Sequence, residues 1–386
     1  MSPNALLNTY ARSPLSFVRG SGPYLFDAHG QRYLDAICGI GVTSLGHARP
    51  ELNEALGAQA NALWLAGNGS LVPQQAALAE RLCALADMDG AFFCNSGAEA
   101  TECAFKLARL HGHARGIAAP KIVVMENAFH GRTLACLSAT DSAKVQAGYA
   151  PLTEGFIRVP FNDLDALRTL IERADIAAVL LECVQGEGGI VPATPAYLAG
   201  VRELCDHAGW LMIADEVQSG FCKTGSWFAY QHFGVLPDVV PLAKALGNGY
   251  PIGACLARGE AAKLFKPGSH GSTFGGSPLA CAVALRVLDL LESERCNERA
   301  KTQGARLARA LREMLAGRED VVAVRQVGLM IGVEFNHEMS GLKARALENG
   351  LLLNVTRERV MRLLPPLNLS ESEFVQLIDK LKGVFA

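Results

Sequence analysis

The sequence has 386 residues, of which 50% are hydrophobic and 19% are charged, and its formal net charge is −2. This length and composition predict a folded protein with a large core, and the small charge gives no reason to expect a nucleic acid or a membrane as a partner. The eleven cysteines form no C-x-x-C pair, so we expect no metal site, no disulfide framework and a reducing, cytoplasmic location. Residues 1–8 lack the features of a secretion signal, and no apolar run is long enough to cross a membrane.

The first part of the chain predicts short strands followed by two helices. Short runs at residues 17–18, 24–26 and 32–34 are separated by glycine-rich turns, which is typical of strands. We expect helices over residues 50–66 and 73–87, and apolar residues recur at helical spacing in the second.

A short apolar strand at residues 91–94 is followed by a turn of small residues and a helix. Ser96, Gly97 and Ala98 form this turn. The free N–H groups at a helix start attract an anion, and small residues let the backbone approach a phosphate closely. An ordinary helix cap at Ser96 is the alternative.

Two further strands end in polar segments. Residues 121–125 lead into Ala-Phe-His-Gly-Arg at 128–132, in which Phe129 can cover a flat ring and Arg132 can bind a carboxylate through two parallel hydrogen bonds. A surface ion pair is the alternative for Arg132. Residues 176–181 predict a buried strand, and the glycines after it are expected to leave Glu187 on a mobile loop.

The strongest chemical signal is an aspartate and a lysine that follow apolar segments. Residues 210–214 predict a strand buried on both faces, and Asp215 ends it at the edge where open α/β sheets bind ligands. Lys244 is the only charged residue between Asp238 and Arg258, so we expect its ammonium form to be poorly solvated and its pKa to be low. A neutral lysine amine can form a Schiff base, and an aspartate can keep a pyridine nitrogen protonated. One cofactor needs both groups, and the pair therefore predicts pyridoxal 5'-phosphate (PLP).

The remaining segments complete an alternation of strands and helices. Ser272 and Thr273 lie in a turn of hydroxyls and glycines, which suits a phosphate or forms a plain turn. We expect helices over residues 195–207, 228–233, 278–291, 298–316 and 371–385, and strands at 252–257 and within 321–335 and 351–364. This order indicates an α/β fold with a mostly parallel central sheet, helices on both faces, and a smaller α+β domain formed by both termini. An NAD-dependent or other nucleotide-binding enzyme is disfavoured, because neither G-x-G-x-x-G nor a P-loop is present.

Together these motifs resemble those of the class III PLP-dependent aminotransferases of fold type I. The resemblance rests on DEVQSG at residues 215–220, AKALGNGYPIG at 243–253, SGAE at 96–99 and AFHGR at 128–132. It extends over nearly the whole chain and is closest to the acetylornithine aminotransferases of that class. It implies a small domain from residues 1–49 and 286–386 and a large PLP-binding domain from residues 50–285.

The resemblance implies nine cofactor-binding residues: Ser96, Gly97, Ala98, Phe129, Asp215, Val217, Gln218, Lys244 and Thr273. The SGAE turn holds the phosphate, Phe129 and Val217 pack on the two ring faces, and Gln218 binds the ring hydroxyl. Lys244 and Asp215 are the catalytic pair. In relatives the residue matching Thr273 reaches the phosphate of the other subunit's cofactor, which implies a homodimer with shared active sites.

The resemblance also implies five substrate-binding residues: Ile40, Arg132, Glu187, Ser272 and Arg362. Arg132 grips a distal carboxylate with Ser272 nearby. Glu187 pairs with Arg362 and masks it until glutamate or 2-oxoglutarate binds, whereas a static ion pair is the alternative. Ile40 stands where free-ornithine aminotransferases have a tyrosine, and an apolar residue there leaves room for an acylated nitrogen.

The implied reaction belongs to arginine biosynthesis. It moves the terminal amino group of N-acetylornithine to 2-oxoglutarate and gives N-acetylglutamate semialdehyde and glutamate, and succinyl-diaminopimelate is a further expected donor. Aminotransferases of the same class that act on succinylornithine, ornithine or 4-aminobutyrate are the alternatives.

Overall fold

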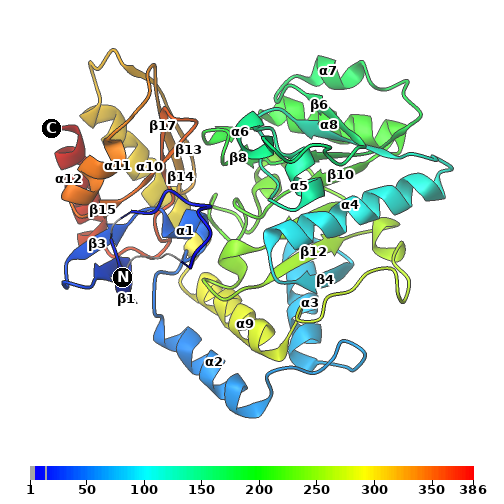
Figure 1. The fold of residues 1–386 in the computed structure, drawn as a ribbon, viewed down its shortest axis with the longest axis horizontal. Coiled ribbons are helices and arrows are strands. Elements are labelled where there is room, and N and C mark those ends of the chain that lie inside the picture. Colours follow the sequence, from blue (N-terminus) through cyan, green and yellow to red (C-terminus); the bar gives the residue numbers. More distant parts are fainter. Residues whose placement is uncertain (1–4, 14) are drawn as a thin grey trace.

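The computed structural model describes residues 5–13 and 15–386, so residues 1–4 and 14 of the expected N-terminal segment lie outside the described part. The chain forms two lobes (Figure 1). The large lobe surrounds a seven-stranded sheet, and the small lobe combines the first and last parts of the chain. Among the described residues, no helix is long and apolar enough to span a membrane.

The central sheet is mostly parallel, as predicted. Its strand order is β4 (Gly90–Cys94), β12 (Gly253–Ala257), β11 (Val239–Leu242), β10 (Leu211–Ala214), β7 (Ile176–Leu181), β5 (Lys121–Met125) and β6 (Phe156–Val159). Only β12 runs against its two neighbours, while β11, β10, β7, β5 and β6 pair in parallel. The carboxyl ends of six strands therefore meet at one edge of the sheet.

Helices cover both faces of this sheet because its strands are apolar on both sides. In β5, Ile122 and Val124 pack in the core under α4 (Gly97–Ala114), whereas Val123 and Met125 pack on the opposite face. That opposite face is covered by α3 (Pro73–Ala86), α8 (Pro195–Ala208) and α9 (Pro278–Ser293). Burying one such aliphatic side chain stabilises the fold by about 1.5–3 kcal/mol relative to leaving it exposed.

The small lobe joins chain segments that are far apart in the sequence. Strands β1 (Phe17–Ser21), β2 (Tyr24–Asp27) and β3 (Arg32–Asp35) form a sheet with β15 (Leu351–Leu352), which pairs in parallel with β3. A second, antiparallel sheet has the order β13 (Val321–Val327), β14 (Met330–Phe335), β17 (Val360–Leu363) and β16 (Asn354–Thr356). Helices α10 (Cys296–Met314), α11 (Leu342–Glu348) and α12 (Glu371–Phe385) pack with both sheets in one core, which confirms an α+β unit built from both termini.

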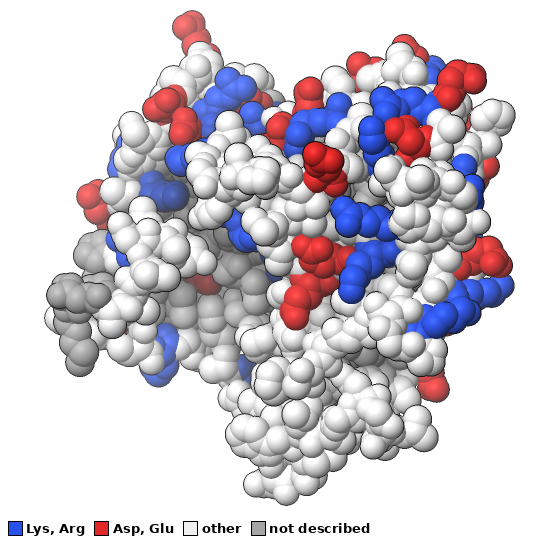
Figure 2. Space-filling model, turned by 45° about the vertical axis from the view of Figure 1, so that its right-hand side comes forward, with Lys and Arg blue, Asp and Glu red and all other residues white. Residues whose placement is uncertain are grey.

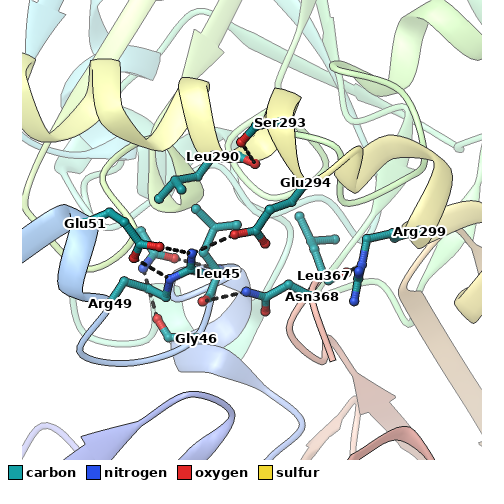
Figure 3. Close-up of polar contacts among 11 residues, drawn as sticks. Leu45, Gly46, Arg49, Glu51, Leu290, Ser293, Glu294, Arg299, Leu367 and Asn368 are labelled. Carbon is teal, nitrogen blue, oxygen red and sulfur yellow. Dashed lines mark hydrogen bonds and ion pairs between the residues drawn. The ribbon is translucent and has the colours of Figure 1, made fainter. Parts of the chain in front are cut away.

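Polar contacts join three segments of the chain where α2 (Pro50–Ala62) begins and α9 ends (Figure 3). Arg49 donates hydrogen bonds to Glu51 at 2.9 Å and to Glu294 at 2.6 Å. Nearby, Asn368 donates to the carbonyl oxygen of Leu45 at 3.2 Å. Three segments from the two ends and the middle of the chain are thus fixed to one another at this junction.

The domain boundaries at residues 49/50 and 285/286 stay predictions. The boundary at 49/50 falls next to Arg49, among the polar contacts shown in Figure 3. The second lies inside α9, whose Val287 and Leu291 pack in the core of the large lobe.

Short elements complete the fold: α1 (Cys38–Gly41), α5 (Leu134–Ala139), α6 (Ala143–Gln146), α7 (Leu164–Arg168), β8 (Val184–Gln185), β9 (Val191–Pro192), η1 (Ala229–Phe233), η2 (Lys244–Leu246) and η3 (Ala261–Lys263). All eleven cysteines lie in the described part of the chain and are free thiols, and all but Cys83 are buried.

Candidate active site

The candidate active site is a cavity of about 310 Å³ at the carboxyl edge of the central sheet. Polar residues that follow four strands of the central sheet line this cavity: His130 after β5, Glu182 after β7, Asp215 after β10 and Lys244 after β11. This edge is where open α/β sheets bind their ligands. The topology of the sheet therefore brings the predicted aspartate and lysine to one cavity.

Asp215 is held in a fixed orientation. It is 5% exposed, its Oδ2 lies 2.8 Å from Nδ1 of His130, and its Oδ1 accepts a hydrogen bond from the N–H of Val217 at 3.0 Å. A buried carboxylate is costly without such partners. His130 was not predicted as a site residue from the sequence, although it lies in the AFHGR segment between Phe129 and Arg132.

Lys244 begins η2 and lies in the wall of the cavity. Its φ of 46° places it in the left-handed region, which non-glycine residues rarely adopt outside functional sites and turns. The pKa of Lys244 is lowered to about 8, first by burial and then by the charge of Arg362, although Glu187 and Asp215 oppose this shift. A considerable share of the amine is therefore neutral near neutral pH.

The first turn of α4 borders the same cavity. Ser96, Gly97 and Ala98 line it, and Ser96 caps the helix by accepting a hydrogen bond from the N–H of Glu99 at 3.2 Å. A Cβ atom on Gly97 would lie 2.7 Å from Cγ1 of Val217, so a larger residue does not fit there. The start of an eighteen-residue helix is an environment that attracts a phosphate.

Three further predicted residues line the cavity, namely Phe129, Val217 and Gln218. Oε1 of Gln218 is buried and has no hydrogen-bond partner among the described residues. A buried amide oxygen of this kind is normally paired, so this atom is available to a ligand in the cavity.

Glu182 is a second buried carboxylate in the cavity, and it was not predicted as a site residue from the sequence. Its Oε1 accepts a hydrogen bond from the N–H of Phe129 at 3.0 Å, and its Oε2 accepts one from the N–H of Gly186 at 3.0 Å. Burial raises the pKa of Glu182 to about 7, and this exceeds the opposing effects of His130 and of the two N–H donors. The signal for Glu182 was present, since it follows a buried strand as Asp215 does.

A larger cavity of about 1490 Å³ opens beside the first, and Lys244 lines both. Ile40, Arg132 and Glu187 line this second cavity. The guanidinium of Arg132 lies 5.6 Å from the centroid of the Phe129 ring. Ile40 has a φ of 65°, which is unusual for a β-branched residue.

Glu187 and Arg362 form an ion pair, with 2.7 Å between Oε1 of Glu187 and Nη1 of Arg362. The side chain of Arg362 is only 1% exposed, and its Nη2 donates a hydrogen bond to Asn354 at 2.9 Å. The side chain of Glu187 is 32% exposed, so the pair joins a buried guanidinium to a partly exposed carboxylate and differs in this from a fully exposed surface pair. Glu187 lies in the turn of a hairpin formed by β8 and β9, and its carbonyl oxygen accepts a hydrogen bond from Thr356 in β16. The mobility expected from the glycines around Glu187 stays a prediction.

Ser272 and Thr273 lie apart from both cavities within the chain. Oγ of Ser272 accepts a hydrogen bond from the N–H of Gly275 at 3.0 Å and lies 3.3 Å from Nδ2 of Asn95, next to the start of α4. Thr273 is exposed. Ser272 therefore lies behind a residue of the first cavity, since Asn95 lines that cavity, whereas Thr273 lies on the surface.

The family model for class III aminotransferases matches residues 8–385 of the chain. The chain belongs to the class III aminotransferases. This aminotransferase is 49% identical over 380 residues to the acetylornithine aminotransferase of Nitrosomonas europaea, with 98% of the chain and 97% of the relative covered. It is 52% identical over 376 residues to acetylornithine aminotransferase 1 of Bordetella pertussis, with 97% of the chain and 96% of the relative covered.

Solved structures of aminotransferases also share the fold of this aminotransferase. The ornithine aminotransferase of Toxoplasma gondii matches with a TM-score of 0.96 at 33% identity, covering 99% of the chain and 93% of that structure. The acetylornithine aminotransferase of Elizabethkingia anophelis matches with a TM-score of 0.88 at 34% identity, and the match covers 99% of the chain and 96% of that structure. These comparisons confirm the predicted family and fold.

Class III aminotransferases use PLP, and the residues of the smaller cavity fit this cofactor. The lysine amine has a lowered pKa, a fixed carboxylate lies in the same cavity, and the start of α4 can accept a phosphate. The unpaired Oε1 of Gln218 and the close fit at Gly97 are further features of a preformed ligand site. The aminotransferase is a PLP-dependent enzyme, as the aspartate and lysine predicted.

Proposed function

We propose that the aminotransferase moves the terminal amino group of N-acetylornithine to 2-oxoglutarate and gives N-acetylglutamate semialdehyde and glutamate, a step of arginine biosynthesis. The observation that carries the proposal is the Glu187–Arg362 pair beside Lys244. One substrate has a carboxylate next to its reacting carbon and the other has an uncharged chain there. An arginine that a carboxylate can mask suits both, and the similarity to two acetylornithine aminotransferases, at 49% and 52% identity, supports the same substrate.

Lys244 and Asp215 carry the chemistry in this proposal. Bound PLP supplies an aldehyde for the lysine amine and a ring that accepts electrons from the reacting carbon. Nζ of Lys244 takes a proton from the carbon that bears the substrate amine and returns it during the exchange. Asp215 holds a proton at the ring nitrogen, and His130 keeps the carboxylate oriented at 2.8 Å.

The other cavity residues position the cofactor. Ser96, Gly97 and Ala98 bind its phosphate at the start of α4. Phe129 and Val217 would pack against the ring of the bound cofactor, and the unpaired Oε1 of Gln218 would accept a hydrogen bond from the ring hydroxyl.

The larger cavity binds the substrates. Arg132 grips the carboxylate at the far end of either substrate, with Ser272 nearby, because its guanidinium matches a carboxylate in geometry and charge. Ile40 leaves apolar room for the acetyl group. Glu187 covers Arg362 while acetylornithine is bound and leaves it when 2-oxoglutarate or glutamate arrives.

The enzyme works in this proposal as a homodimer in which Thr273 reaches the cofactor phosphate of the partner. Support comes from the surface near Thr273. No charged residue occurs between Glu54 and Glu80, and the lower part of the molecule in Figure 2 is almost free of charged side chains. Trp64 is 67% exposed and Leu71 is 98% exposed in that segment. Apolar surface of this kind is typical of an interface, and a second copy of the chain is the proposed occupant.

The same loop connects this surface to Thr273. Nδ2 of Asn68 donates a hydrogen bond to the carbonyl oxygen of Ser272 at 2.8 Å, and Phe274 is 63% exposed. We place the enzyme in the cytoplasm, where its free thiols would stay reduced.

The proposal is tested with a panel of amino donors and 2-oxoglutarate. N-acetylornithine should give the highest kcat/KM, ahead of N-succinylornithine, ornithine and 4-aminobutyrate. Higher kcat/KM with free ornithine would exclude the substrate assignment. Glu187→Gln should impair the acetylornithine half-reaction more than the glutamate half-reaction, because Arg362 is left unmasked, and equal losses would exclude the masking role.

A further inference from the structure

The part of the hairpin that precedes Glu187 in the sequence is hydrogen-bonded to the large lobe. The N–H of Gly186 donates a hydrogen bond to Oε2 of Glu182 at 3.0 Å. Nε2 of Gln185 donates to the carbonyl oxygen of Glu126 at 2.7 Å. Both partners follow strands of the central sheet, so the hairpin begins from a fixed position.

The same hairpin is attached to the small lobe at Glu187 itself and just beyond it. Oγ1 of Thr356 donates to the carbonyl oxygen of Glu187 at 2.7 Å. Nε and Nη2 of Arg325 donate to the carbonyl oxygen of Gly189 at 3.1 and 2.9 Å, while its Nη1 donates to Glu334 at 2.6 Å. Thr356 is 6% exposed, so its bond to the hairpin is shielded from water.

We propose that Thr356 and Arg325 are positioning residues that fix the backbone of Glu187, so that Glu187 leaves Arg362 by side-chain rotation while the hairpin stays in place. A movement of the whole hairpin would break the bonds at Gly186, Glu187 and Gly189 together. Rotation about the side-chain bonds breaks only the ion pair. This inference rests on the proposed function and explains how the masking carboxylate moves.

Thr356 also lies close to the carboxylate that moves. Its Oγ1 is 3.4 Å from Oε2 of Glu187, whereas Oε1 makes the 2.7 Å contact with Arg362. The hydroxyl thus holds the backbone and borders the side chain in its masking position. Loss of the hydroxyl therefore weakens the masking of Arg362 and affects the acetylornithine half-reaction first.

Hydrogen–deuterium exchange of the PLP-loaded dimer tests the fixed backbone directly, with glutarate as a dicarboxylate probe that cannot react. Amides of residues 184–192 should exchange equally slowly with and without saturating glutarate. In Arg325→Ala they should exchange about three- to tenfold faster, the scale expected for loss of one or two hydrogen bonds. Glu334 keeps Arg359 as a partner at 2.9 Å in this variant, so no carboxylate is left unpaired.

Arg312→Ala is the matched control. Arg312 is exposed and donates to the carbonyl oxygen of Val324 on the same strand as Arg325, at 3.1 Å, without touching the hairpin. Exchange in residues 184–192 should not change in this control. Faster exchange of wild-type residues 184–192 in the presence of glutarate would overturn the inference, because the hairpin itself would then move.

Single-turnover kinetics separate positioning from a general structural role. Thr356→Val should raise the KM for N-acetylornithine about three- to tenfold and change the KM for glutamate by less than about twofold. Thr356→Ser keeps the hydroxyl and should restore wild-type values. Equal changes in both half-reactions, or no rescue by serine, would overturn the role of Thr356. If wild type prefers another donor, the proposed substrate fails, while the exchange experiment still decides whether the backbone is fixed.

Discussion

Cofactor uptake by Lys244 should depend on pH around 8, because its pKa is lowered to about 8 from the ordinary value of 10.5. A lowered lysine pKa means that the neutral amine, the reactive form, is lost as the pH falls below 8. At pH 7 about one amine in ten is then neutral, against about one in three thousand for an ordinary lysine, a difference of about 300-fold. The rate of PLP binding should therefore rise about tenfold per pH unit below 8 and level off above it.

The assay mixes PLP with cofactor-free protein over a range of pH and follows the visible absorbance of the lysine adduct. Nα-acetyl-lysine serves as the control, since its rate should continue to rise toward pH 10. Borohydride should fix the label on Lys244, and Lys121, which pairs with Asp175 at 3.1 Å, should stay unlabelled. Arg362→Gln should shift the levelling-off to higher pH, because one neighbouring positive charge is removed. If the rate of PLP binding to the protein still rises tenfold per pH unit above pH 9, the pKa of Lys244 is not lowered as stated.

Three further predictions concern the cofactor site. Asp215→Asn should retain the fold and PLP but lose activity by about 100-fold or more, because an amide cannot hold the ring proton, and wild-type turnover would exclude this role. Gly97→Val should weaken PLP binding about tenfold or more in a fluorescence titration, because even its Cβ would lie 2.7 Å from Cγ1 of Val217, and unchanged affinity would show that the turn adapts. Mixing Lys244→Ala chains with Thr273→Ala chains should restore part of the activity, since one site of each heterodimer carries neither change, and absence of rescue would count against shared sites.

The apolar patterns made much of the large lobe predictable from the sequence. The helix expected at residues 73–87 is α3, which ends at Ala86, and the strand expected at 176–181 is β7 with the same bounds. Asp215 and Lys244 were predictable because a charge in an apolar segment needs a partner or a function, whatever the details of the fold. The short elements β6 and β11 were missed, and β11 contains Pro241, which is unusual inside a sheet.

The partners of the site residues were less predictable because they come from distant parts of the chain. Arg325 is 136 residues from Gly189, and Thr356 is 169 residues from Glu187. The glycines around Glu187 predict a mobile segment. This local pattern carries no information about the bonds from Arg325 and Thr356, because those residues lie far away in the sequence. His130 was missed for a related reason, since its contact with Asp215 joins residues that are far apart in the sequence. Glu182 could have been predicted, because it follows the buried strand β7 as Asp215 follows β10.

The pairing of β3 with β15 also limits the order in which the two lobes can fold while the chain is being synthesised on the ribosome. Leu34 pairs with Leu351, so the first strands are synthesised long before their partner. Tyr24, Leu34 and Ala36 pack in a core whose other buried members lie beyond residue 300, so these three apolar side chains stay uncovered while the large lobe is synthesised. Contacts over such separations form slowly, and uncovered strands of this kind are prone to aggregate. We therefore expect the small lobe to be the last part to fold and the part whose nascent chain benefits most from chaperones.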